Sequence, residues 1–156
     1  MSVEKVREYF KPYGIADRIL EPEHSSATVE EAAKAVGCEP ARIAKTMSFL
    51  TTNGPILVVL AGDARTDNKK FKDEFHEKAK MIHAEDVEAL IGHAPGGVCP
   101  FAVNEGVTVY LDDSLKRFET VFPAAGSGNS AIELSLEELE TYSHSVKWVN
   151  VGKGWE

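Results

Sequence analysis

Cysteine is scarce in this chain of 156 residues, which holds only Cys38 and Cys99. The two are far apart and neither forms a C-x-x-C pair, which argues against a disulfide scaffold or a zinc ribbon and fits a reducing compartment. Long apolar runs are also missing. The longest, residues 55–62, is far too short to cross a bilayer, and residues 1–13 alternate charged with apolar side chains instead of resembling a signal peptide. We therefore expect a cytoplasmic protein that does not contact a membrane.

Basic side chains are outnumbered, since 17 Lys and Arg face 25 Asp and Glu and leave a formal net charge of −8. A protein that binds nucleic acid over a broad surface needs clustered basic residues, so the composition argues against that class. It does not exclude a small site that contacts only one end of a nucleic acid. The length and the 43% of hydrophobic residues are typical of one globular domain, here residues 1–156. Such a chain buries roughly 70% of its unfolded surface.

Hydrophobic periodicity and capping residues predict helices interspersed with strands. Several strand connections are too short for parallel crossovers, so we expect an α/β protein of the α+β type with a mixed sheet wrapped by helices. The predicted helices cover residues 3–10, 28–36, 67–76, 84–91 and 135–142, with N-caps at Thr28 and Ser135 and a further helical turn over 39–44. The predicted strands cover residues 45–51, 56–61, 107–111, 120–124, 131–134 and 146–149, with a hairpin turn at Asn53-Gly54 and an extended piece over 18–23.

Lys45 is unusual because it interrupts an apolar pattern. In the strand predicted around it, period-two alternation places Lys45 on the same apolar face as Met47. A charged amine there is costly to bury unless an anion or a set of acceptors meets it. The side chain either binds a phosphate or carboxylate as a point charge, or protects an edge strand from aggregation, or extends out to solvent.

Two loops are rich in small or rigid residues. Residues 92–101 (GHAPGGVCPF) hold three glycines and two prolines, which pre-set the backbone and let another molecule approach closely. Consecutive N–H groups in such a loop can bind an anion or a developing oxyanion. Residues 125–130 (AGSGNS) form a second small-residue loop that could line a pocket. Each loop has a simpler interpretation, as a rigid connector or as a plain turn.

Other reactive residues form no recognisable constellation. His76 and His83 lack the spacing of a helical metal pair, so no metal site is expected. Cys99 has no obvious base nearby and is better interpreted as a structural thiol than as a nucleophile. The basic cluster at Lys69, Lys70 and Lys72 is typical of a solvated helix face, with a phosphate contact as the alternative.

Four segments together resemble the YbaK/prolyl-tRNA-synthetase-associated domains, which edit mischarged tRNA. They are HSSATVEEAA (residues 24–33), IAKT (43–46), AGDARTD (61–67) and GHAPGGVCPF (92–101). Each is weak alone, but their order and spacing are specific, and the similarity covers nearly the whole chain. The resemblance implies a compact fold around a mixed, barrel-like sheet. It also implies metal-independent, cofactor-free hydrolysis of the ester between a wrong amino acid and the terminal adenosine of a tRNA.

The resemblance further implies roles for individual residues. The lysine that matches Lys45 holds the phosphate-bearing end of the tRNA, and the loop that contains Gly96 and Gly97 supplies backbone groups near the scissile carbonyl. A ribose hydroxyl of the substrate helps to activate water, so no protein nucleophile is needed. We take Lys45, Gly96 and Gly97 as the catalytic positions. The expected substrate-binding positions are His24, Thr28, Thr46, Met47, Asp63, Gly92, Pro95, Val98, Pro100, Gly126, Gly128 and Asn129.

The sequence departs from parts of the family where the amino acid is selected. Some members carry an acidic residue or a histidine in the loop after Gly126, whereas this chain has Asn129, Ser130 and Ala131. The substrate preference of those members therefore does not transfer. We expect weak, transient binding of a mischarged tRNA acceptor end by a monomer, with a synthetase as a further partner. A non-catalytic aminoacyl-tRNA or synthetase-binding module, or a hydrolase of small esters, would use the same pocket.

Overall fold

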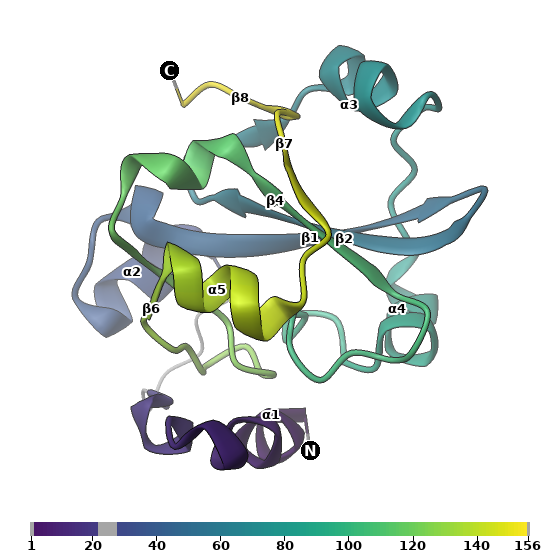
Figure 1. The fold of residues 1–156 in the computed structure, drawn as a ribbon. Helices are drawn as coiled ribbons and strands as arrows, with labels where there is room; N and C mark the ends of the chain where they lie inside the picture. The colour runs from purple at the N-terminus through teal and green to yellow at the C-terminus, as the bar shows by residue number, and fades with distance from the viewer. Residues whose placement is uncertain (1, 22–27, 156) are drawn as a thin grey trace.

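The computed structural model describes residues 2–21 and 28–155, in which helices and strands are interspersed as expected (Figure 1). The helices of these ranges are α1 (Ser2–Phe10), α2 (Val29–Val36), α3 (Asn68–Phe75), α4 (Ala84–Ile91) and α5 (Leu136–Ser143), with 3-10 turns η1 (Lys11–Tyr13), η2 (Ala16–Arg18), η3 (Pro40–Arg42) and η4 (Asp113–Arg117). The strands are β1 (Ile43–Thr51), β2 (Gly54–Ala61), β3 (Arg65–Thr66), β4 (Thr108–Asp112), β5 (Thr120–Pro123), β6 (Leu134–Ser135), β7 (Lys147–Val149) and β8 (Gly152–Lys153).

Six strands form one mixed sheet in the order β6-β5-β1-β2-β4-β7. The β1–β2 and β5–β6 pairs are antiparallel, whereas the β1–β5, β2–β4 and β4–β7 pairs are parallel. The sheet curls into half a barrel, and helices pack around it (Figure 1). The expected fold class, a mixed barrel-like sheet surrounded by helices, is confirmed.

The two faces of the β1–β2 hairpin carry separate parts of the core because side chains alternate along a strand. One face packs against α1, α4 and α5, and the other packs against α3. A third, small cluster joins Ala33 of α2 to Ile43 and Phe122. Representative members are Phe10, Leu57, Ile91 and Leu139 on the first face, and Phe49, Val58, Leu60 and Phe71 on the second.

Helix capping follows the sequence closely. The Thr28 hydroxyl accepts from the Glu31 N–H at 3.1 Å, and Gly37 ends α2 in the left-handed conformation at φ +77°. Ser135 and Glu138 form a complete capping box at the start of α5. These local bonds satisfy backbone groups that a helix end would otherwise leave unpaired. Both predicted N-caps are confirmed.

Two predicted boundaries are wrong because strand pairing overrides local propensity. The helical turn expected over residues 39–44 ends at Arg42, since Ile43 already pairs with Phe122 of β5. The strand expected over residues 131–134 shrinks to β6, because Ala131 instead makes isolated bridges to Leu20 and Ala124.

The extended piece expected over residues 18–23 is also shorter. Arg18 belongs to the 3-10 turn η2, and the backbone becomes extended at Ile19. Leu20 then exchanges backbone hydrogen bonds with Ala131. Residues 22 and 23 lie outside the described part of the chain.

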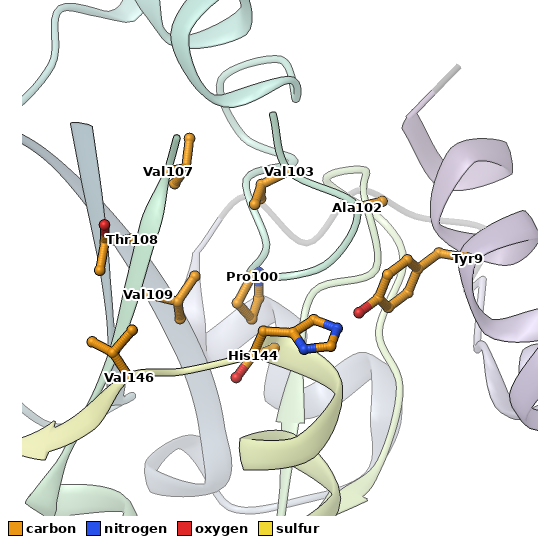
Figure 2. A pocket seen from close by; sticks show the side chains of 10 residues that line it. Tyr9, Pro100, Ala102, Val103, Val107, Thr108, Val109, His144 and Val146 are labelled. Atoms are coloured by element: carbon orange, nitrogen blue, oxygen red, sulfur yellow. The ribbon is translucent and has the colours of Figure 1, made fainter. Parts of the chain in front are cut away.

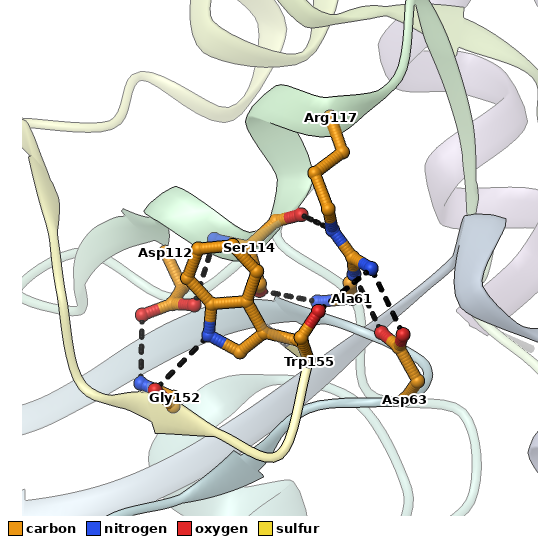
Figure 3. A network of polar contacts seen from close by, with 7 residues as sticks. All are labelled: Ala61, Asp63, Asp112, Ser114, Arg117, Gly152 and Trp155. Atoms are coloured by element: carbon orange, nitrogen blue, oxygen red, sulfur yellow. Dashed lines mark hydrogen bonds and ion pairs between the residues drawn. The ribbon is translucent and has the colours of Figure 1, made fainter.

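The β3–β8 ribbon was not expected from sequence, and a buried carboxylate organises the segment that forms it (Figure 3). Asp112, fully buried, accepts hydrogen bonds from the N–H groups of Val151 (2.8 Å), Gly152 (3.0 Å) and Ser114 (3.0 Å). The Ser114 hydroxyl accepts in turn from the Ala61 N–H at 3.0 Å. One side chain thus connects the end of β4, the turn η4 and the C-terminal segment.

Within residues 2–21 and 28–155, no helix has the length and apolar character needed to cross a membrane. The expectation that residues 1–156 form one domain stays a prediction.

We predict that Asp112→Ala lowers the free energy of unfolding by about 3 kcal/mol or more, because three N–H groups would lose their acceptor, all of them on the buried residues Ser114, Val151 and Gly152. Chemical denaturation monitored by circular dichroism measures this change. The matched control is Asp113→Ala, because Asp113 makes only a partly exposed ion pair with Lys116. Its removal should cost at most about 1 kcal/mol. Equal midpoints for the two variants would contradict the structural role of Asp112.

Candidate active site

The site begins at an interruption in the pairing of β1. Strand β5 pairs with β1 only at Ile43 and Ala44. Further along the same edge, the Leu50 N–H donates to the Lys80 carbonyl at 2.8 Å and the Ser48 carbonyl accepts from the Ile82 N–H at 3.1 Å. Between these two contacts, no described segment pairs with this edge of β1. Because backbone groups alternate along a strand, the N–H and C=O of Thr46 point into this gap.

A cleft of about 690 Å³ opens at the gap. Its walls come from the start of α2, strand β1, the segment that leads into α4, the glycine-rich loop, strand β5 and the small-residue loop. The lining residues are Thr28, Val29, Ala32, Ile43, Ala44, Lys45, Thr46, Ser48, Met81, Ile82, His83, Ala84, Val87, Pro95, Gly96, Val98, Phe122, Ala124, Ser127, Gly128, Ser130 and Ala131.

Lys45 lies at this cleft half-buried, and its register partner on β2 is Leu60. It therefore occupies the sheet face that carries Met47 and Phe49, as the alternation predicted. Its amine makes no hydrogen bond or ion pair with a described residue. Burial lowers the pKa of Lys45, while the negative charge of Asp63 opposes this shift. The amine is thus a cationic donor whose partner would have to come from outside the described residues.

Thr46 adds a second unsatisfied group beside Lys45. Its hydroxyl oxygen is buried and has no hydrogen-bond partner among the described residues. Buried hydroxyls are usually paired, so an isolated one in a cleft indicates a position where a ligand or water can bind. Together with the backbone groups of Thr46, it adds polar contacts to the wall that β1 forms.

Asp63 is held away from the cleft by Arg117 (Figure 3). The guanidinium donates to both carboxylate oxygens, at 2.6 and 2.9 Å, and this contact holds the pKa of Asp63 below its ordinary value. Asp63 still acts on Lys45 through its charge but does not bond to it. Both of its carboxylate oxygens accept hydrogen bonds from Arg117.

The glycine-rich loop is closed by a buried histidine. His93 Nε2 lies 2.7 Å from the Phe101 carbonyl, so this nitrogen carries the proton and donates, and burial lowers the pKa of His93. The Gly97 N–H donates to the Ala94 carbonyl at 2.9 Å and forms the turn at the tip. Gly96 lines the cleft, whereas Gly97 is buried behind it.

Gly97 allows the two loops to touch. A Cβ atom at this position would lie 2.7 Å from the Gly126 carbonyl oxygen and 2.9 Å from Ser127 Cα. In the small-residue loop, Ser130 Oγ accepts from the Ser127 N–H at 3.0 Å, and Ser127 Oγ donates to Asn129 Oδ1 at 2.9 Å. These bonds orient Ser127 and Ser130 along the cleft wall.

The cleft brings together about half of the residues that the sequence predicted for the site. Met47 lies on the same sheet face as Lys45 but packs with the α3 cluster and does not line the cleft. Gly92 is the C-cap of α4. Gly126 and Asn129 lie in the small-residue loop without lining the cleft. His24 lies outside the described residues. The predicted positions that do line the cleft are Thr28, Lys45, Thr46, Pro95, Gly96, Val98 and Gly128.

Pro100 borders a different pocket of about 210 Å³, which shares no lining residue with the cleft (Figure 2). Tyr9, His144 and Val146 also line this pocket, and the Tyr9 hydroxyl donates to the Tyr142 carbonyl at 2.5 Å. Burial raises the pKa of Tyr9 to about 12. Pro100 therefore does not line the cleft.

Sequence reasoning missed the segment of Met81, Ile82 and His83, which forms one cleft wall. The sequence does contain a signal for this wall, because the two apolar residues Met81 and Ile82 directly follow the mostly charged residues 77–80. Ser127 and Ser130 were noticed only as part of a loop. The partnered backbone of residues 80–82 explains why this connector is ordered against β1.

Comparison with protein families matches residues 23–142 to the family described as "Aminoacyl-tRNA editing domain". The chain belongs to this family. The match includes the whole β1–β2 hairpin and both loops of the cleft, so the resemblance inferred from four short segments is confirmed.

Similar proteins support the same family. YwhH of Bacillus subtilis (strain 168), an uncharacterized protein, is 49% identical over 157 residues, which cover 100% of both chains. The "Putative Cys-tRNA(Pro)/Cys-tRNA(Cys) deacylase EbsC" of Enterococcus faecalis is 29% identical over 88% of this chain and 84% of its own. A crystal structure of "a putative trans-editing enzyme for prolyl tRNA synthetase" superposes with a TM-score of 0.89 at 27% identity, covering 98% of each chain.

We predict that Cys99 resists alkylation in the folded protein, because it is fully buried and burial raises the pKa of its thiol to about 12. At neutral pH almost none of this thiol is the reactive thiolate. Iodoacetamide labelling followed by peptide mass spectrometry should modify the half-buried Cys38 first, and Cys99 only after denaturation. Rapid labelling of Cys99 in the native protein would reopen its interpretation as a nucleophile.

Proposed function

We propose that this protein hydrolyses the ester bond of a mischarged aminoacyl-tRNA. The observation that carries the proposal is the half-buried amine of Lys45, without a described partner, at a large cleft in a chain of the aminoacyl-tRNA editing family. A cation in that position can bind the phosphate-bearing end of the tRNA. The aminoacyl group would then lie between the glycine-rich loop and the small-residue loop.

Backbone groups of the glycine-rich loop would stabilise the oxyanion that forms at the ester carbonyl. Of the two glycines predicted for this role, Gly96 lines the cleft, while the Gly97 N–H already donates to Ala94. We therefore assign the donor role to Gly96 and a turn-forming role to Gly97. Removal of one such donor typically costs about 10²-fold to 10³-fold in rate.

The attacking water would be activated by the substrate itself. Among the described residues that line the cleft, Lys45 and His83 are the only titratable side chains, and none is a carboxylate. A ribose hydroxyl of the terminal adenosine is then the group nearest to the ester that can assist proton transfer. In this reaction the protein supplies positioning and electrostatic stabilisation, which need neither a metal nor a protein nucleophile.

The cleft walls favour an uncharged amino acid. Apolar side chains, among them Met81, Val98 and Phe122, face the cleft. The polar side chains that the small-residue loop contributes to the cleft are the hydroxyls of Ser127 and Ser130. A charged aminoacyl side chain would lose its hydration there without gaining a partner. The relative named as a Cys-tRNA deacylase makes Cys-tRNA(Pro) the first substrate to test. We further propose that the protein acts as a monomer that binds tRNA transiently, alone or with a synthetase.

We predict that Lys45→Ala lowers kcat/KM for deacylation by about 10²-fold, because it removes a charged contact to the substrate. Release of radiolabelled amino acid from a panel of mischarged tRNAs measures this change. Lys45→Arg separates charge from geometry and should recover only part of the activity. Lys11→Ala is the control, because Lys11 lies in η1 and pairs with Glu8 on the protein surface.

The outcomes of this panel separate the alternatives. No release above buffer for any substrate would remove the proposed hydrolase activity for that set. Binding of aminoacyl-tRNA without turnover, still dependent on Lys45, would instead favour a non-catalytic binding module. Equal activity on tRNA and on small esters would favour a general esterase. His83→Gln should retain activity if the substrate hydroxyl, and not His83, assists the water.

A further inference from the structure

The β3–β8 ribbon places two cations directly opposite each other. Arg65 of β3 and Lys153 of β8 are register partners in an antiparallel pair, and both side chains are exposed. Like charges in directly opposed positions destabilise a sheet. Neither side chain makes a hydrogen bond or ion pair with a described residue. In a chain with a formal net charge of −8, an uncompensated cationic pair requires an explanation.

The ribbon is continuous with the cleft through Lys45. Strand β2 ends opposite Ala44 of β1, and the turn through Asp63 leads directly into β3. The residues just before the two ribbon strands also pack on the sheet face that Lys45 occupies. They are Ala64, before β3, and Val151, before β8, and both belong to the core cluster of that face. Arg65 is close enough to Lys45 for its charge to lower the pKa of that amine. Lys45, Arg65 and Lys153 thus form a row of cations that leads out of the cleft.

Two of the three carboxylates beside this row, Asp63 and Asp67, accept hydrogen bonds from other groups. Asp63 is bonded to Arg117 through both oxygens. Asp67 caps α3 by accepting from the Lys70 N–H at 3.0 Å, although its charge also acts on Lys153. The negative charge of Glu30, on α2, also acts on Lys45, but the two side chains form no ion pair. The row therefore keeps a local positive charge that an anionic ligand can neutralise.

The ribbon is also held rigidly. Gly152 donates to the buried Asp112 and its carbonyl accepts from the Trp155 indole N–H at 3.0 Å and from the Lys70 amine at 2.8 Å (Figure 3). A Cβ atom at Gly152 would lie only 2.7 Å from Asp112 Oδ2. The backbone of Lys153 is thus held next to that of Arg65 before any ligand arrives, which lowers the backbone entropy lost on binding.

We propose that Arg65 and Lys153 bind the phosphate groups of the nucleotides that precede the terminal adenosine of an RNA whose end occupies the cleft. This inference rests on the proposed function for the identity of the ligand. Arginine suits phosphate because its planar guanidinium donates two parallel hydrogen bonds, and lysine adds a point charge. The contacts carry no sequence information. They set the direction in which the strand leaves the cleft.

Binding of a short RNA tests the proposal without any catalytic readout. The probe is a 5′-fluorescein-labelled single-stranded RNA that ends in adenosine, and its Kd is measured by anisotropy at several salt concentrations. Loss of two phosphate contacts in Arg65→Gln/Lys153→Gln should reduce the slope of log K against log salt by about 1.4. The ratio of the variant Kd to the wild-type Kd should therefore fall about sevenfold between about 50 and 200 mM salt.

Two control variants keep the result interpretable. Arg65→Lys/Lys153→Arg preserves both charges and should keep the wild-type slope, whereas Lys11→Gln removes one charge at η1 and should also leave it unchanged. Thermal melting checks that the double Gln variant is folded, and Lys153→Gln alone serves if it is not. Unchanged slopes in both Gln variants would overturn the proposal.

Activity separates this proposal from the proposed function. With aminoacyl-tRNA as substrate, the double Gln variant should lose about tenfold in kcat/KM at low salt. With an aminoacyl-adenosine that lacks the preceding phosphates, it should stay within about twofold of wild type. An equal loss on both substrates would overturn the phosphate assignment. A wild-type protein that binds RNA with the expected slope but hydrolyses neither substrate would overturn the hydrolase and leave the phosphate contacts standing.

Discussion

The free stretch of the β1 edge is the feature on which the site depends. β2 pairs with β1 along its length, but on the opposite edge β5 and residues 80–82 bond only to its two ends. A fully paired edge would bring a neighbouring strand against Lys45 and Thr46 and fill the cleft. The two flanking pairings instead hold the opening at a fixed width. They also satisfy the backbone groups on either side, so the cost of the interruption is confined to a few residues.

Close approach of backbone segments fixes the walls around this opening. A Cβ atom at Gly62 would lie 2.0 Å from the Pro40 carbonyl oxygen, and one at Gly97 would lie 2.7 Å from the Gly126 carbonyl oxygen. Any side chain at either position would force backbone to move. Gly62 therefore sets the contact between the end of β2 and the turn before β1, and Gly97 sets the contact between the two loops. These glycines act through packing, because neither has a positive φ.

Local sequence patterns predicted the structural features that depend on neighbouring residues in the chain. They did not predict the features that form where distant segments of the chain meet. Alternation placed Lys45 on the correct face, and Ser135 marked a helix start, because each signal lies within a few residues. The β3–β8 ribbon has only two residues per strand, too few for any periodic signal, and its position depends on Asp112 from another part of the chain. Met81 lies at the cleft because its segment forms a backbone bridge to Phe49 of β1. Backbone bonds of this kind produce no periodic pattern of side chains that a sequence would reveal.

The acidity of the chain and a cationic path out of the cleft are compatible because electrostatic effects are local in salt solution. The Debye length at physiological ionic strength is about 8 Å, so acidic side chains on distant surfaces are largely screened from a ligand at the cleft. Within that range the three charges of Lys45, Arg65 and Lys153 outnumber the two of Glu30 and Asp67, since Asp63 is paired with Arg117. The remaining negative surface repels other parts of a polyanion. For the proposed hydrolase, binding would then be restricted to one end of the ligand, and this would favour rapid release once the ester has been cleaved.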